Sequence, residues 1–282
     1  MKYMKCFFLA ALLATTVLFS QAQQLTMAQP SPTQTIKQNF GLGSIELNYS
    51  RPGLKGRKIG SADFVPYGKV WRTGANAATT LQFSDDVTIG ATLVKAGKYG
   101  LLSIPDANEW ILIISKDINI NAPELYKQEN DVVRVKAAVK KMGDKIETFT
   151  INFTNISSNS CDLELAFENT AVILPVTTNT DERIMKQIDN ILVKDTKPYY
   201  AAALYYYDNG KDLAKAKEWI DKASADPANA KSLNVFWLKA RIHQKLGDKA
   251  GAKASAEKLI EIATAAKNED YIKRAQDFIK AL

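Results

Sequence analysis

The spacing of apolar residues changes near Thr180, and this change divides the chain into two kinds of structure. Before Thr180, apolar residues tend to recur at every second position, and after it they recur at every third or fourth position. A period of two is that of a strand with one buried face, whereas a period near 3.6 is that of an amphipathic helix. The sequence therefore predicts an all-β part followed by an all-α part.

The first part, residues 34–177, is predicted to be an antiparallel β-sandwich with a jelly-roll-like arrangement. Residues 44–50, 132–140 and 147–153 alternate apolar and polar side chains, as half-buried strands do. Residues 109–115 are apolar on both faces and are expected to form an interior strand. Short Asp-, Asn-, Gly- and Pro-containing turns separate roughly ten such runs. The absence of intervening helical patterns excludes a parallel α/β sheet.

The second part, residues 178–282, is predicted to be an all-α helical-repeat region. Thr180 can cap its first helix, because Asp181 and Glu182 then lie in the first turn, where the helix dipole favours negative charge. Five further amphipathic helices are expected over residues 198–209, 212–225, 232–246, 249–266 and 269–282.

These helices also carry an internal repeat. Four positions in one pair of helices correspond to four positions 36 residues later. The corresponding residues are Tyr207 and His243, Ala216 and Ala252, Ile220 and Ala256, and Ala223 and Leu259. A glycine separates the two helices each time, and Pro227 closes the first unit. The pattern is similar to two tetratricopeptide-type repeats followed by a terminal helix, although helical hairpins of any origin favour small residues where they cross.

The amino terminus has the features of a secretory signal peptide. Lys2 and Lys5 precede an apolar stretch over residues 6–19, and the small residues Ser20 and Ala22 then occupy the positions third and first before a cleavage site. The alternative is an uncleaved anchor, but the apolar stretch is shorter than the about 20 residues that cross a bilayer. We therefore expect a signal peptide over residues 1–22, a flexible leader over residues 23–33, and export to the periplasm or the cell exterior without a membrane span after cleavage.

Charge and cysteine content exclude two classes of protein. Removal of Lys2 and Lys5 lowers the formal net charge from +7 to +5, and the basic residues are scattered rather than clustered with aromatic residues. Nucleic acid is therefore not an expected partner. Cys161 is the one cysteine that would remain, so no disulfide can form within the mature chain. Its place among the inward-facing residues of an alternating run predicts a buried thiol rather than a nucleophile.

Several chemistries that a sequence often reveals are missing from this one. His243 is the only histidine in the sequence, and it occupies a position where the helical repeat calls for a packed aromatic residue. We therefore do not expect Ser-His or Cys-His catalytic pairs, or metal sites with histidine ligands, in the β domain. Residues 51–60 hold glycines and lysines but lack the ending of a phosphate-binding loop, and we expect a mobile basic loop there. No cofactor and no metal ion are predicted.

Carboxylates remain as candidates for catalysis. A glycosidase needs only two of them at a suitable separation, and four lie in or near predicted turns of the β domain: Asp63, Asp106, Glu109 and Asp117. Each has a simpler role as a turn former or a solvated residue, and the sequence does not identify a pair.

The stretch VPYGKVWRTGANAATTLQFS, residues 65–84, concentrates the residues that could hold a ligand: Tyr67, Trp71, Arg72 and Asn76. Flat rings, a guanidinium and an amide suit a glycan or a small anionic ligand. The same residues could instead anchor a long loop against the end of the sandwich. Neighbours on an extended segment point to opposite sides, so we expect Trp71 to be structural and Arg72 to line a shallow polar pocket.

Four motifs occur in this order: NYSRPGLKGRKI, the stretch over residues 65–84, VKAGKYGLLSIP and ETFTINF. Together they resemble a secreted bacterial family known as domain of unknown function 2911, and the resemblance covers about residues 34–176. The chain has Phe167-Glu168 where a Trp-Glu pair is usual, and a Trp-Gly pair expected near Ile120 is not evident. The family has no established activity, so the resemblance implies secretion, a domain boundary and a following helical region.

Two functions remain open at this point. The first is a non-enzymatic binding module with a helical region that contacts a protein partner. The alternative is a carboxylate-dependent hydrolase that acts on glycans or peptides. Paired acids in a cleft beside Trp71 would favour the hydrolase.

Overall fold

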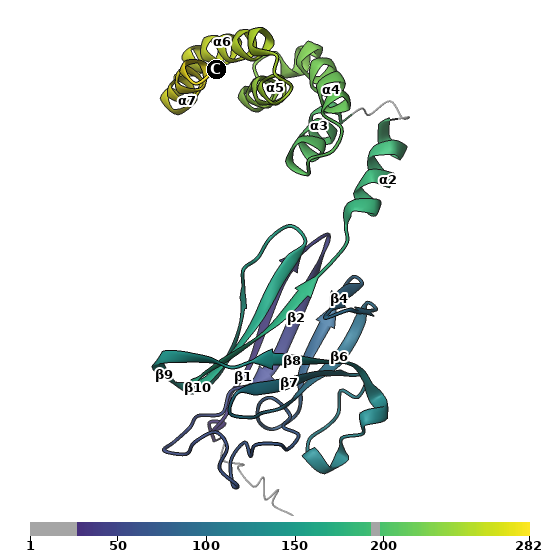
Figure 1. Cartoon of the computed structure of the whole chain (residues 1–282), viewed down its shortest axis with the longest axis vertical. Helices are drawn as coiled ribbons and strands as arrows, with labels where there is room; N and C mark the ends of the chain where they lie inside the picture. The colour runs from purple at the N-terminus through teal and green to yellow at the C-terminus, as the bar shows by residue number, and fades with distance from the viewer. Residues whose placement is uncertain (1–26, 193–197) are drawn as a thin grey trace, which may run out of the picture. The chain divides into compact units, whose positions relative to one another are not determined.

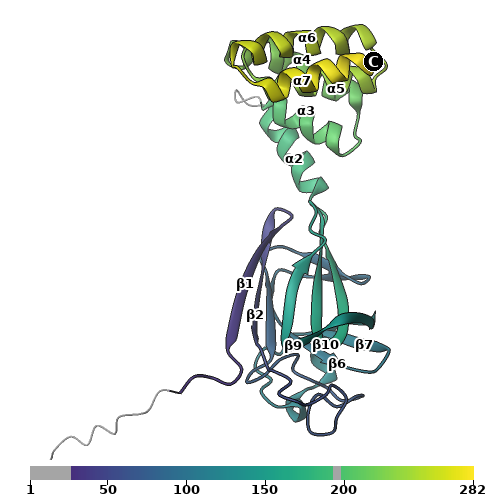
Figure 2. The same cartoon turned by 90° about the vertical axis from the view of Figure 1, so that its left-hand side faces the viewer.

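The computed structural model describes residues 27–192 and 198–282 (Figures 1 and 2). The chain separates into two compact units, one that ends at Asn179 and one that spans Thr180–Leu282. The predicted signal peptide, residues 1–22, and the first residues of the predicted leader, 23–26, lie outside the described residues.

The described part of the first unit, residues 27–179, contains ten strands in two antiparallel sheets. The six-stranded sheet has the order β1 (Thr33–Phe40), β2 (Gly43–Ser50), β3 (Thr79–Phe83), β6 (Gly97–Ile104), β7 (Glu109–Ser115) and β8 (Asp131–Ala138). The four-stranded sheet has the order β5 (Thr92–Val94), β4 (Val87–Ile89), β10 (Ser160–Thr177) and β9 (Lys140–Thr154). The predicted antiparallel β-sandwich is confirmed.

The two sheets share one apolar core, which the alternating sequences predicted. Leu47 of β2 is fully buried, and Tyr49 beside it is buried to 99%. The Tyr49 ring meets the Phe149 ring of β9 edge-on, with centroids 6.0 Å apart. The Tyr49 hydroxyl also accepts a hydrogen bond from the backbone N–H of Ile151, at 3.0 Å. Tyr49 therefore joins the sheets by apolar contact and by a buried hydrogen bond.

Strand β7 lies between β6 and β8 and is buried on both faces, as its continuous apolar sequence predicted. Trp110, Leu112 and Ile114 belong to the main core between the sheets. Ile113 points to the other face, where it packs in a smaller cluster with Ile120 and other apolar residues. This second cluster holds the chain segment that follows β7 against the outside of the sheet.

Strand β10 reverses direction within its own length. The backbone N–H of Thr178 donates to the carbonyl of Asn159 at 2.9 Å, so the two ends of β10 lie together. The register with β9 shifts around Glu168, whose φ of 54° lies in the left-handed region. A reversal at Glu168 places the preceding residue, Phe167, in the middle of the core, where it is fully buried.

The described part of the second unit contains six α-helices (Figure 1). They are α2 (Asp181–Leu192), α3 (Tyr199–Asp208), α4 (Leu213–Ala225), α5 (Leu233–Lys245), α6 (Lys249–Ala265) and α7 (Glu269–Lys280). Four of the starts are capped by side chains that accept hydrogen bonds from backbone N–H groups, namely those of Asp212, Ser232, Asp248 and Asn268. These caps satisfy donors that a helix start otherwise leaves open, which explains why the helices begin where they do.

Helix α3 packs against α4, and α5 packs against α6, as two consecutive helical hairpins. The residues that recur at a separation of 36 positions are buried where the hairpins cross, except Tyr207, which is half-buried. His243 is buried, and its Nδ1 lies 2.7 Å from Asp248 Oδ2. Because Asp248 also caps α6, His243 fastens the end of α5 to the start of α6. This arrangement agrees with the packed histidine expected from the repeat.

Among residues 27–192 and 198–282, no helix combines the length and the apolar composition needed to cross a bilayer.

Cys161 gives a test of the core. Its side chain is fully buried, and burial, followed by the charge of Asp162, raises the pKa of the thiol to about 11. We expect a bulky maleimide to leave Cys161 unlabelled in the native protein at about pH 7.5, because the reagent needs an exposed thiolate. Mass spectrometry should detect a label on Cys161 only after unfolding in denaturant. Complete labelling of the native protein would contradict the position of Cys161 in the core.

Candidate functional site

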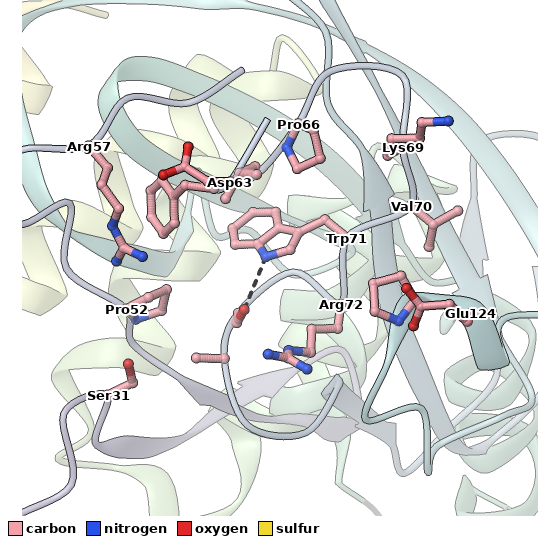
Figure 3. A pocket seen from close by; sticks show the side chains of 15 residues that line it. Ser31, Pro52, Arg57, Asp63, Pro66, Lys69, Val70, Trp71, Arg72 and Glu124 are labelled. Atoms are coloured by element: carbon pink, nitrogen blue, oxygen red, sulfur yellow. Dashed lines mark hydrogen bonds between the residues drawn. The ribbon is translucent and has the colours of Figure 1, made fainter. Parts of the chain in front are cut away.

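The largest described connections of the β-sandwich meet at a pocket with a volume of about 680 Å³ (Figure 3). One connection, residues 51–78, joins β2 to β3, and the other, residues 116–130, joins β7 to β8. The pocket is lined by Ser31, Pro52, Arg57, Asp63, Phe64, Val65, Pro66, Lys69, Val70, Trp71, Arg72, Gly74, Ala75, Pro123 and Glu124. Its walls are therefore mainly apolar, and charged side chains project from both connections.

Trp71 belongs to the core and also forms part of the pocket wall. It exchanges two backbone hydrogen bonds with Ser103 of β6, at 2.7 and 2.9 Å, which hold this part of the connection in an extended conformation. Its ring stacks on Phe167 with an interplanar angle of 9°, and its Nε1 donates to the carbonyl of Gly74 at 3.0 Å. Only 8% of the residue is exposed. Trp71 thus has the structural position that the sequence predicted.

Arg72 follows Trp71 and is half-buried rather than buried. It lines the pocket, and its guanidinium donates a hydrogen bond to the backbone carbonyl of Asn121 in the other connection. Because adjacent residues of an extended segment point in opposite directions, the burial of Trp71 leaves Arg72 on the open side. The contact with Asn121 then fixes where the guanidinium lies.

A second guanidinium enters the pocket from Arg57. It lies 3.7 Å from the centroid of the Phe64 ring, and it donates to the carbonyls of Leu54 and Gly53 at 3.1 and 3.0 Å. Figure 3 shows the guanidinium groups of Arg57 and Arg72 turned toward the same space beside Trp71. The stacking on Phe64 and the two hydrogen bonds to backbone carbonyls restrict the Arg57 side chain, because an arginine without such contacts is flexible.

The segment that carries Arg57 is more firmly packed than the mobile basic loop that its sequence suggested. Leu54 is fully buried in the main core, and its backbone N–H donates to the carbonyl of Glu147 at 2.9 Å. The backbone N–H of Ile59 donates to the Glu168 carboxylate at 3.1 Å. Sequence reasoning emphasised the glycines and lysines and therefore overlooked the anchoring role of Leu54 and Ile59.

Backbone strain is concentrated around Trp71. Val65 and Thr73 have φ values of 47° and 54°, which are unusual for β-branched residues. Each such conformation costs about 1–3 kcal/mol and persists only where surrounding contacts enforce it. Thr73 is held by a hydrogen bond of 2.9 Å between its hydroxyl and that of Ser103, and the Val65 carbonyl accepts from the N–H of Gly60 at 2.9 Å. Strain of this kind accumulates at binding and catalytic sites.

The other wall of the pocket is a closed loop. The backbone N–H of Lys116 donates to the carbonyl of Asn130 at 2.9 Å, so the two ends of residues 116–130 lie together. Ile120 anchors the loop, because its side chain is 99% buried and its carbonyl accepts from the N–H of Ala78 at 2.9 Å. Compact loops with adjoining ends often carry functional residues. In this loop Pro123 and Glu124 face the pocket.

Two carboxylates line the pocket, and they come from different connections. Asp63 was among the acids named from the sequence, whereas Glu124 was not. The remaining named acids have the surface or turn roles that their sequence context suggested: Asp106 and Asp117 accept hydrogen bonds from the N–H groups of Ala107 and Asn119, and Glu109 pairs with Lys136 at 3.0 Å. No described residues form a group of three or more His, Cys, Asp or Glu side chains that could hold a metal ion.

Of the four residues predicted to bind a ligand, the structure brings two to the pocket. Trp71 and Arg72 line it, whereas Tyr67 and Asn76 are not among the described residues that do. Tyr67 is 41% exposed, and its ring covers Gly60. The Asn76 amide donates to the carbonyl of Ser31 and to the Ser50 hydroxyl, at 3.1 and 3.2 Å, and thereby holds a left-handed turn.

Residues 31–176 match the family described as protein of unknown function (DUF2911). This region is more than half of the chain and contains both sheets except the last residue of β10, Thr177. The chain belongs to the DUF2911 family. All residues that line the pocket lie within the DUF2911 region, whereas the helical unit follows it. No curated protein and no solved structure matches the chain.

The different positions of Trp71 and Arg72 predict different effects on stability. Trp71→Ala should reduce the free energy of unfolding by about 3–5 kcal/mol, because it removes a buried aromatic ring. Arg72→Ala should reduce it by about 1 kcal/mol or less, because it removes one hydrogen bond at the surface. Denaturant unfolding of both variants beside the wild type measures the difference. Equal losses would contradict the assignment of Trp71 to the core and Arg72 to the pocket.

Asp131 provides a test that depends on pH. It lies at the base of the 116–130 loop, where its Oδ2 accepts a hydrogen bond of 2.6 Å from Tyr126 and its Oδ1 is buried without a partner. Burial raises the pKa of the Asp131 carboxyl and outweighs the opposing effects of Tyr126 and Arg134. A raised pKa in the folded state means that the protonated form stabilises the fold and that this contribution is lost as pH rises through the folded pKa.

We therefore expect Asp131→Asn, which cannot ionise, to gain stability relative to the wild type as pH rises above about 4, the ordinary pKa of aspartate. Melting temperatures of both proteins between about pH 3.5 and pH 7 measure this trend. Asp144→Asn, an exposed substitution in β9, is the control and should follow the wild type. A growing advantage of the wild type toward neutral pH would be the opposite result.

Proposed function

We propose that this protein is exported and that its β-sandwich binds a small ligand with an anionic group in the pocket beside Trp71. The observation that carries the proposal is the convergence of the Arg57 and Arg72 guanidiniums on one pocket. Guanidiniums recognise carboxylate and phosphate groups through paired hydrogen bonds, and a fixed guanidinium loses less entropy on binding. The apolar wall formed by Phe64, Val65 and Trp71 would contact the rest of the ligand.

Export is proposed from the amino-terminal sequence. The charged residues Lys2 and Lys5, the apolar stretch over residues 6–19 and the small residue Ala22 have the order of a signal peptide cleaved after Ala22. The destination would be the periplasm or the cell exterior. The pocket at the loop end of an exported β-sandwich domain would then be exposed to small molecules outside the cytoplasm.

The helical unit is proposed to be a tetratricopeptide-like region that contacts a protein partner. Its surface carries arginines stacked on aromatic rings: the Arg241 guanidinium lies 4.4 Å from the centroid of Tyr207, and that of Arg274 lies 5.1 Å from the centroid of Tyr271. Arginine and aromatic residues are enriched in protein interfaces and in the residues that contribute most to binding energy.

A hydrolase remains the second candidate because Asp63 and Glu124 both line the pocket beside Trp71. Two acids from separate connections could act as an acid and a base or nucleophile on a glycan or a peptide. Both side chains are exposed, and each projects from a connection rather than from a strand. Sites on loops are held less precisely than sites on strands, which favours binding over catalysis.

A titration of small carboxylates tests the binding proposal. Calorimetry would compare each acid, such as an N-acyl amino acid or a uronic acid, with its uncharged amide. We expect the acids to bind more tightly. Arg72→Ala should weaken their binding about 10- to 100-fold, as expected for the loss of a hydrogen bond between charged groups worth about 1.5–3 kcal/mol.

Lys98→Ala is the matched control, because Lys98 of β6 is exposed and is not among the pocket residues. It should leave binding unchanged. Equal affinity for acids and amides, or normal binding by Arg72→Ala, would refute recognition of an anion by this pocket. Turnover of a peptide or a glycan that is abolished by Glu124→Gln or Asp63→Asn would establish the hydrolase instead.

A further inference from the structure

The pocket contains both signs of charge, and the two signs are not paired with each other. Arg57 and Arg72 direct their hydrogen bonds to backbone carbonyls rather than to acids. Asp63 and Glu124 are exposed, and neither forms an ion pair with any residue that the structure describes. Lys69 also lines the pocket, but Figure 3 shows its side chain extending away from the Trp71 ring. Beside Trp71, a ligand therefore meets two guanidiniums and two carboxylates that are not paired with each other.

The separation of these charges results from the way each side chain is attached. Arg57 is held by the Phe64 ring and by its own loop, and Arg72 is held by the carbonyl of Asn121. Glu124 lies in the short 3-10 turn Pro123–Leu125 of the anchored 116–130 loop, and Asp63 lies beside buried Phe64. Figure 3 shows Asp63 and Glu124 at different sides of the Trp71 ring. The acids thus occupy separate parts of the wall.

Carboxylates in the wall also select against some ligands. A second anionic group on the ligand would approach Asp63 or Glu124, and the repulsion would oppose binding. An ammonium group at the same place would be attracted. The arrangement therefore disfavours dianions and favours a ligand with one negative and one positive group, separated by an apolar part that fits against Val65, Val70 and Trp71.

We propose that the ligand of this pocket is a small zwitterion, namely a short peptide with a free amino and a free carboxyl terminus. This inference rests on the proposed function, because it assigns the ligand carboxylate to Arg57 and Arg72. It adds that Asp63 and Glu124 determine specificity by binding the ligand ammonium. The volume of about 680 Å³ lies in the range of pockets that enclose small organic ligands.

Three forms of one peptide separate the contributions of its ends. Calorimetry on the full mature chain would compare Ala-Leu-Ala with free ends, its N-acetylated form and its C-terminal amide. The free peptide should bind most tightly. N-acetylation should weaken binding about three- to tenfold, because an exposed ion pair contributes about 1 kcal/mol. Amidation should weaken binding through the loss of the contact with the arginines.

Substitution of the two acids should remove the preference for the free amino group. The double variant Glu124→Gln/Asp63→Asn should bind the free and the N-acetylated peptides equally. It should also bind an N-succinylated peptide, which carries two carboxylates, more tightly than the wild type does. Asp144→Asn, the exposed substitution in β9, is the matched control and should retain the wild-type preference. A structural role of the acids would not produce this change in ligand preference.

The outcomes distinguish the two proposals. If the N-acetylated peptide binds the wild type as tightly as the free peptide, or if simple carboxylates bind through Arg72 while the free peptide does not, the zwitterion inference is wrong and the anion site stands. If the acid substitutions leave the preference intact, their assigned role is wrong. If neither carboxylates nor any peptide form binds, the proposed function itself fails.

Discussion

The packing of Trp71 between the two sheets is the contact on which the rest of the pocket depends. Its ring stacks on Phe167, and its backbone is paired with Ser103. A buried tryptophan contributes several kcal/mol, which is enough to offset strained backbone on either side of it. Because Trp71 fixes the second half of the 51–78 connection, Arg72 emerges on the open side, and Phe64 supports Arg57 nearby.

The same packing connects the pocket with the reversal of β10. Phe167 can stack on Trp71 because the chain turns at Glu168, and the Glu168 carboxylate then accepts a hydrogen bond from the N–H of Ile59 at 3.1 Å. One reversal therefore supplies an aromatic partner for Trp71 and an anchor for the segment that carries Arg57. Two parts of the chain about a hundred positions apart are joined by these contacts, so pocket geometry is a property of the completed sandwich.

Local patterns could predict the elements but only part of the site. The period of two revealed the strands, and the change near Thr180 revealed the helices, because both depend on residues close in sequence. Alternation also separated Trp71 from Arg72. Glu124 could not be found in this way, since its place depends on how Ile120 anchors a distant loop. The Asn76 amide stabilises a left-handed turn, and the sequence alone does not distinguish such an amide from one that binds a ligand.

Different side chains form the core of the β-sandwich and the charged rim of the pocket. Trp71 and Phe167 are buried, so changes there alter the core on which both walls are built. Arg57, Asp63 and Glu124 are exposed charges on anchored segments, and their substitution removes little buried surface. In a pocket with a fixed apolar wall and a charged rim, substitutions at the rim can alter which ligand is bound without loss of stability. A ligand of this pocket would therefore be identified from the charges at its rim rather than from the fold, because proteins that share a fold can bind different ligands.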